Sequence, residues 1–246
     1  MAILNSIIGI LFIFAVSYLL SNNKKHIKWR TIIIGFLIQF GFALIVLKWS
    51  VGRYVLSKVA LGVQGVISYA NEGIGFVFGS LTNDGSIFVV NVLCVIIFIS
   101  AVVSILYYLG IMQFIIRVIG GALSKLLGTS QLETISASAN IFLGQTEAPL
   151  LIKPYVAKLT ESELFTVMVG GLASVSGSIL VGYSLLGIPI EYLISASFMA
   201  APAGLIISKM LYPETEFDKI QNEVKMVNDT IIYLRALLGG NPEFIK

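Results

Sequence analysis

The sequence predicts an all-α integral membrane protein with about five transmembrane helices, further helices at the membrane interface and one re-entrant helical hairpin. Two observations predict this fold class: 57% of the residues are hydrophobic while 12% are charged, and apolar runs recur along the whole chain. Soluble domains carry about 25% charged residues, so a mean hydropathy of +0.94 indicates that lipid is the solvent. The net charge of +3 is spread along the chain, and nucleic-acid binding requires a concentrated basic face.

Five apolar runs are long enough to cross a bilayer, which takes about 20 helical residues. We expect these spans at residues 2–20, 31–47, 87–109, 161–186 and 190–211. The first run lacks the basic start and cleavage site of a signal peptide, so it is expected to be retained. The loop at 21–30 carries four cationic side chains, those of Lys24, Lys25, Lys28 and Arg30. The positive-inside rule therefore places this loop in the cytoplasm and the N-terminus outside.

Two segments have apolar residues at helical spacing on one face, with isolated charges and glycines elsewhere. The segment 55–81 follows the second span and is expected on the outer surface, while 112–128 follows the third span and is expected on the inner surface. This pattern is typical of helices that lie along a membrane interface. Packing against other helices of the protein explains the pattern equally well.

The segment 129–158 predicts a re-entrant hairpin. Its first part, up to Phe142, covers about 21 Å as a helix, which is too short for a hydrocarbon core of about 30 Å. Ser130 is expected to cap this helix, with Glu133 as its capping-box partner. Gly144 and Pro149 then interrupt the chain, and a second short run follows to residue 158. Both arms are expected to enter and leave on the cytoplasmic side.

The span 161–186 is expected to be a broken helix. It opens with the capping box "TESE" and then contains "GGLASVSGSILVGY", in which eight of fourteen residues are Gly, Ala or Ser. Small residues permit close helix contact but weaken the helix, and an interruption inside the membrane frees backbone carbonyls. The segment 213–246 is polar and lacks an apolar run long enough to cross the membrane.

Polar side chains gather at the tip of the predicted hairpin, where Gln145, Thr146 and Glu147 follow one another and Asn140 precedes them by about one turn. Such groups at bilayer depth are costly and persist where they face a cavity. They suit a planar, uncharged, polar molecule, or a small cation that also uses freed carbonyls near Leu143 and Ser174. The plainer alternative is a loop tip in water. The chain has no HExxH, Cys/His cluster, Gly-x-Ser-x-Gly or glycine-rich phosphate loop, so we expect neither an enzyme nor a bound cofactor.

The stretches "ANIFLGQTEAPLLIKPY" and "LFTVMVGGLASVSGSILVGY" resemble the bacterial branch of the concentrative nucleoside transporter family. The resemblance covers the chain to about residue 212 and implies a cation-coupled nucleoside symporter of the cytoplasmic membrane. It implies three scaffold spans with an external helix in residues 1–110. It also implies the first half of a transport domain in 111–212, which an inverted second copy completes. Family members form homotrimers in which the transport domain moves as an elevator.

The resemblance also implies roles for single residues. The nucleobase would be held at five positions, namely Gly144, Gln145, Thr146, Glu147 and Ile179. The coupling cation would be bound by the side chains of Asn140, Thr146 and Ser174 and by the carbonyls of Leu143 and Val175. The oxygen ligands favour Na⁺, while titration of Glu147 would suit H⁺ instead.

Family members continue for about another half chain, whereas nothing after Val227 resembles their next span. We therefore expect a truncated or aberrant C-terminus and no nucleoside accumulation by this polypeptide alone. The alternative is a half-subunit that assembles with a second half or with a full-length protomer. A third hypothesis is a channel-like or ion-binding membrane protein without an organic substrate.

Overall fold

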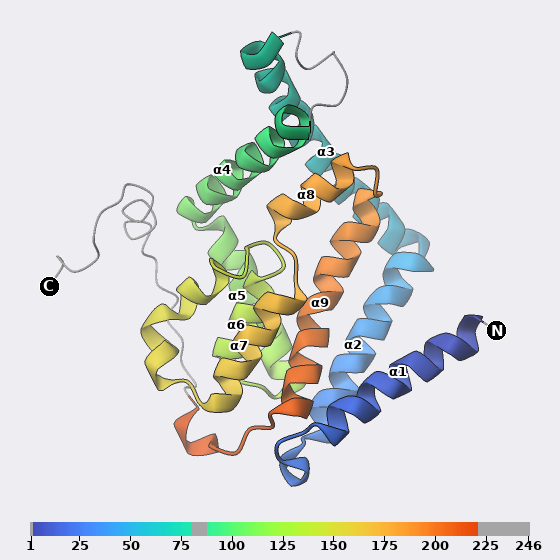
Figure 1. The fold of residues 1–246 in the computed structure, drawn as a ribbon, viewed down its shortest axis with the longest axis vertical. Helices are drawn as coiled ribbons and strands as arrows, with labels where there is room; N and C mark the ends of the chain where they lie inside the picture. Colours follow the sequence, from blue (N-terminus) through green and yellow to red (C-terminus); the bar gives the residue numbers. More distant parts are fainter. Residues whose placement is uncertain (1, 80–87, 221–246) are drawn as a thin grey trace, which may run out of the picture.

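The structure is a computed structural model that describes residues 2–79 and 88–220 (Figure 1). Within these ranges every regular element is a helix. The longer helices are α1 Ala2–Leu19, α2 Trp29–Leu47, α3 Ser50–Phe78, α4 Cys94–Tyr108, α5 Ile111–Leu127, α6 Gln131–Ala139, α7 Glu161–Ala173, α8 Gly177–Leu185 and α9 Ile190–Leu211. A π-helical turn, η3 Val89–Leu93, leads into α4, and three 3₁₀ helices are η1 Lys24–His26, η4 Ala148–Lys158 and η5 Phe217–Lys219.

Four helical segments of the described chain are long and apolar enough to cross a membrane, namely Trp29–Val46, Val89–Tyr108, Glu161–Leu185 and Ile190–Leu211. These correspond to four of the five predicted spans. The first predicted span forms a helix, but its apolar stretch Leu4–Leu19 is shorter than the others. Residue 87 of the third span, residues 80–81 of the external segment and residues 221–246 of the tail lie outside the described residues.

The helices α3 and α5 correspond to the two segments that were predicted to lie at an interface. α3 begins at Ser50, five residues before the predicted start, and its buried face packs on α4 in a cluster that also contains Val181 of α8. In α5 the buried positions recur every three or four residues and pack on α6 and the segment after it; they include Met112, Ile116, Gly120, Leu123 and Leu127. Each helix therefore packs one face against protein and leaves the other face exposed, and the position of a membrane surface along them stays a prediction.

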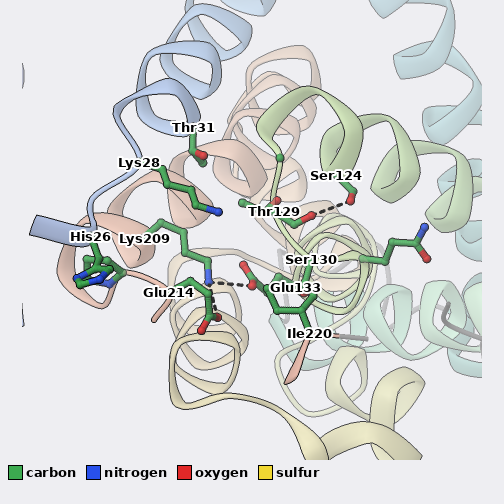
Figure 2. A pocket seen from close by; sticks show the side chains of 13 residues that line it. His26, Lys28, Thr31, Ser124, Thr129, Ser130, Glu133, Lys209, Glu214 and Ile220 are labelled. Atoms are coloured by element: carbon green, nitrogen blue, oxygen red, sulfur yellow. Dashed lines mark hydrogen bonds and ion pairs between the residues drawn. The ribbon is translucent and has the colours of Figure 1, made fainter. Parts of the chain in front are cut away.

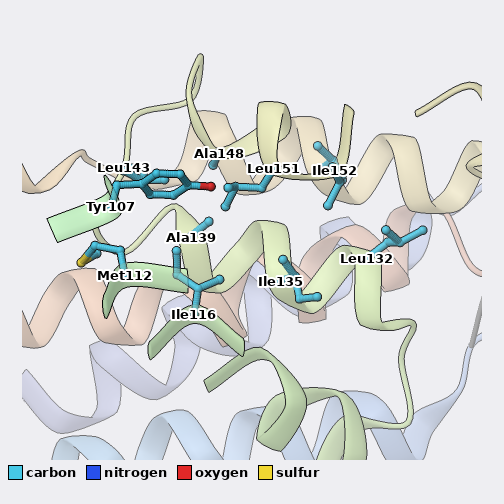
Figure 3. Packing of buried hydrophobic residues seen from close by; sticks show 11 residues of the cluster. Tyr107, Met112, Ile116, Leu132, Ile135, Ala139, Leu143, Ala148, Leu151 and Ile152 are labelled. Atoms are coloured by element: carbon cyan, nitrogen blue, oxygen red, sulfur yellow. The ribbon is translucent and has the colours of Figure 1, made fainter. Parts of the chain in front are cut away.

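The helices α6 and η4 form an antiparallel pair. In Figure 3 the chain runs from Leu132 past Ala139 to Leu143, and it then turns and returns past Ala148 to Ile152. All five side chains are buried in one apolar cluster, which also contains Ile116 of α5 and Val167 of α7. The first arm ends at Ala139, three residues earlier than the predicted Phe142, because turns begin at Asn140. The second arm is a 3₁₀ helix that contains Pro154.

Candidate binding site between the hairpin tip and the helix interruption

The predicted broken span is divided into α7 and α8 by three non-helical residues. α7 ends at Ala173, and Ser174 has an extended backbone with φ −118° and ψ 164°. The Ser174 hydroxyl donates to the Gly170 carbonyl at 2.7 Å, so this side chain bonds to the last turn of α7. α8 starts after Ser176. The last carbonyls of α7 have no partner in a following turn, and the negative end of its helix dipole lies at the interruption.

The tip of the α6–η4 pair contacts this interruption directly. The Gly177 amide donates to the Phe142 carbonyl at 3.0 Å, which joins the start of α8 to the end of the first arm. A Cβ atom placed on Gly144 would lie 3.7 Å from Cβ of Ser176. From α9, the Ser197 hydroxyl donates to the Ile141 carbonyl at 2.9 Å. The tip is therefore fixed to α8 and to α9 through its own backbone.

Two adjacent glycines of α7 permit this close approach. A Cβ atom on Gly170 would lie 3.2 Å from Nδ2 of Asn140, and one on Gly171 would lie 3.1 Å from Cβ of Gln145. Both distances are tighter than ordinary van der Waals contact. Gly170 also faces Gly204 of α9, because a Cβ atom on Gly204 would lie 3.7 Å from the Gly170 Cα. These glycines therefore allow α6, α7 and α9 to meet at the tip.

The Asn140 side chain is the most unusual group at the site. Its residue is 1% exposed, and neither Oδ1 nor Nδ2 has a hydrogen-bond partner among the described residues. An unsatisfied buried polar group costs about 1–3 kcal/mol, so such groups require an explanation. The ends of α6 and α7 both present carbonyls and negative dipole ends here, which favours a cation beside the amide oxygen.

The other predicted site residues lie at the tip or on the α8 side of the interruption. Gln145, Thr146 and Glu147 are exposed at the tip, and the Gly144 amide donates to Oε2 of Glu147 at 3.4 Å. Leu143 is buried, whereas Val175 and Ile179 are 39% and 45% exposed on the α8 side of the interruption. The described residues hold no group of three or more His, Cys, Asp or Glu side chains suited to a metal ion. A cation at this place would therefore use amide, hydroxyl and carbonyl oxygens.

A second polar cluster lies at the opposite end of α6, and sequence reasoning did not single it out. We name it the basal cluster, and it consists of Glu133, Ser162, Lys209 and Glu214, of which Figure 2 labels Glu133, Lys209 and Glu214. Glu133, Lys209 and Glu214 line a cavity of about 280 Å³ that also borders the basic loop at His26 and Lys28. Burial raises the pKa of the Glu133 carboxyl, and the Lys209 ammonium opposes that rise. A lysine near the end of an apolar span was the available signal.

The fold and the site define a class of protein: a helical membrane protein whose polar groups converge on interrupted helices, as in secondary transporters. Residues 8–81 match the family model described as Na⁺ dependent nucleoside transporter N-terminus, and residues 89–189 match the model described as nucleoside recognition. The chain belongs to the concentrative nucleoside transporter family and corresponds to the N-terminal half of its members.

Relatives and solved structures agree with this assignment. The uncharacterized transporter YutK of Bacillus subtilis (strain 168) is 54% identical over 92% of this chain and 57% of its own length. The nucleoside permease NupC of Helicobacter pylori is 47% identical over 86% of this chain and 52% of its own. The structure of CNTnw in an inward-facing, substrate-bound state has a TM-score of 0.88 at 46% identity, over 97% of this chain and 60% of that one. The chain thus spans little more than half the length of these proteins.

Proposed function

We propose that this chain supplies one half of the substrate and cation site of a nucleoside symporter, which imports nucleosides across the cytoplasmic membrane. The observation that carries the proposal is the buried, unpartnered amide of Asn140 at the meeting point of the hairpin tip and the α7–α8 interruption. A polar tip beside broken helices is the arrangement in which transporters bind polar substrates and coupling ions. The family match supports nucleosides as the substrate class.

The nucleoside is proposed to bind at the exposed tip. The backbone of Gly144 permits close approach, and Gln145, Thr146 and Glu147 offer donors and acceptors to the edge of a planar base. The exposed side chain of Ile179 would provide an apolar contact to the base. Hydrogen bonds and apolar contacts of this kind suit an uncharged base.

The coupling cation is proposed to bind beneath the tip, next to Asn140. Its ligands would be the side-chain oxygens of Asn140, Ser174 and Thr146, together with the carbonyls of Leu143 and Val175. The Ser174 hydroxyl uses its hydrogen on Gly170, which leaves its oxygen lone pairs for a cation. An all-oxygen ligand set favours Na⁺, and proton coupling through Glu147 is the alternative that the experiment below separates.

The membrane arrangement of the whole protein belongs to the same proposal. Residues 129–158 would form a re-entrant hairpin that opens to the cytoplasm, with the N-terminus outside and the loop 21–30 inside. The α6–α9 part would belong to a transport domain that moves as an elevator against scaffold spans in residues 1–110 of a homotrimer. Since the chain spans little more than half the length of the matched relatives, transport would also require the part of the protein that corresponds to their second half.

The site is tested by thermal unfolding of the purified chain in detergent, with NaCl or choline chloride and with or without uridine. A ligand that binds only the folded state at 100 times its Kd stabilises by about 2.7 kcal/mol. We expect Na⁺ to raise the apparent melting temperature and Asn140→Ala to abolish that increase. Gln131→Ala, an amide removed from the other end of α6, should retain it.

Glu147→Gln should keep the Na⁺ effect and lose the additional effect of uridine. Equal melting temperatures of the parent chain in Na⁺ and choline, with a uridine effect that varies with pH, would favour proton coupling. No effect of uridine under any condition would contradict the nucleoside site in this half. Uptake in cells without their own nucleoside carriers, with this chain alone and together with the C-terminal half of a relative, tests the need for a second half.

A further inference from the structure

The basal cluster joins the first turns of two helices to the last turn of a third. The Lys209 ammonium of α9 lies 2.8 Å from Oε1 of Glu133 in α6 and donates to the Ser162 hydroxyl of α7 at 2.7 Å. The two charged side chains are 9% and 1% exposed. Figure 2 shows the ammonium between the Glu133 and Glu214 carboxylates, with the Glu214 Oε2 at 3.8 Å. The Lys209 side chain thus bridges α6 and α7.

The two helices begin with the same capping signature, yet they use its glutamate differently. In α7, Glu163 closes the box, since its Oε2 accepts from the Thr160 amide at 3.0 Å. In α6, the Ser130 hydroxyl accepts from the Glu133 amide, but the Glu133 carboxylate turns to Lys209 instead of the capping position. The predicted capping role of the Glu133 side chain is therefore wrong. Its carboxylate is committed to a contact between helices.

Stability alone does not explain a buried ion pair. Removing two charges from water costs several kcal/mol per ion, and well-packed apolar residues of similar volume are often equally stable or more stable. The attested use of such a pair is to select one register between packed elements. In this protein the register in question is the axial position of α6 relative to α7.

The two helices run in parallel from the basal cluster to the binding site. Seven residues separate Glu133 from Asn140 and eight separate Ser162 from Gly170, about 10.5 and 12 Å at 1.5 Å per residue. The two lengths agree within one residue. At their far ends, Asn140 and Gly170 lie in contact. Any sliding of α6 along α7 would therefore disturb both ends together.

We propose that Lys209 is a positioning residue that sets the axial register of α6 against α7, so that the hairpin tip meets the helix interruption. The consequence for nucleoside transport depends on the function proposed above, whereas the register does not. Lys209 acts through Glu133 and Ser162 and touches neither substrate nor cation.

A disulfide reporter measures this register without any ligand. In a Cys94→Ala background, Gly144→Cys and Ser176→Cys place two Cβ atoms about 3.7 Å apart, within the range that a disulfide requires. The chain is oxidised in membranes, and the remaining thiols are counted by the gel shift that a maleimide polymer produces. Gel filtration in detergent reports the folded fraction of each variant.

We expect the reporter to cross-link in the parent and Lys209→Met to slow the reaction about tenfold or more, because it leaves a buried charge unpaired. The deciding variant combines Glu133→Met with Lys209→Met, which removes both charges and keeps apolar bulk. If the pair sets the register, this folded variant still cross-links slowly. Parental cross-linking in either folded variant would overturn the proposal, since the pair would then only stabilise the fold.

The double variant tests the register proposal even if the single variant Lys209→Met does not fold. The two proposals also fail separately. If cross-linking depends on Lys209 but neither uridine nor Na⁺ raises the melting temperature of the chain, only the proposed function is contradicted. If uridine and Na⁺ stabilise the chain as expected but cross-linking does not depend on Lys209, only the register proposal is contradicted.

Discussion

Replacement of Gly120 by alanine tests whether close contact between α5 and α6 holds the first arm of the hairpin in place. A Cβ atom on Gly120 would lie 3.1 Å from the Cα and N atoms of Ile135 and from the Thr134 carbonyl oxygen. These are backbone atoms of α6 and cannot rotate away. Gly121 is the matched control, because a Cβ atom there meets no atom within 4 Å and lies in the same helix.

The magnitudes follow from two opposing terms. Alanine gains about 1 kcal/mol of helix propensity over glycine at either position. At Gly120, overpacking against α6 costs about 1–3 kcal/mol. Gly121→Ala should therefore stabilise by up to about 1 kcal/mol, and Gly120→Ala should range from neutral to about 2 kcal/mol destabilising. The two variants should differ by about 1–3 kcal/mol, which corresponds to about 2–12 °C for a chain of this size.

The assay is loss of the monodisperse gel-filtration peak after heating in detergent, with both variants prepared side by side. Gly120→Ala is also expected to weaken the Na⁺ effect, because a displaced α6 carries Asn140 with it. If both variants raise the apparent melting temperature equally, the contact between α5 and α6 does not constrain the hairpin.

Two further predictions concern the tip and the helix starts. Gly171→Ala pushes against Cβ of Gln145 at 3.1 Å and should weaken uridine binding about tenfold, equivalent to about 1.4 kcal/mol, while the Na⁺ effect persists; unchanged uridine affinity would separate Gln145 from the substrate. Thr160→Ala removes the cap on the Glu163 amide and the 2.7 Å bond to Glu214, and should cost about 1–2 kcal/mol in the same heating assay. Ser130→Ala, which removes a 3.4 Å contact, should cost less, and the reverse order would contradict this ranking.

Several features of the site could be predicted from the sequence because they depend on a few neighbouring residues. The interruption of the α7–α8 segment was expected from its small residues, and the structure ends α7 at Ala173 and begins α8 at Gly177. The capping box at Thr160 and Glu163 is confirmed in full. The polar tip was recognised from residue type, and its function stays a prediction.

Other features could not be predicted because their causes lie far along the chain. Nothing local distinguishes Glu133 from Glu163, which occupy equivalent positions in two similar motifs, until Lys209 approaches only one of them. Gly170 and Gly171 were expected to permit close contact and to weaken the helix, and only the structure shows that the close contacts are with Asn140 and Gln145.

The sequence by itself determined four of the helical stretches that are apolar enough for a membrane, the interruption within residues 161–186 and the end of the last apolar stretch near residue 211. These properties follow from hydropathy, periodicity and the backbone effects of Gly and Pro, which act within a turn or two. Only the tertiary structure decided that the Asn140 amide is buried without a partner and that Lys209 joins α6 to α7. Burial and charge pairing are set by the elements that pack together, and the partners here lie tens of residues apart.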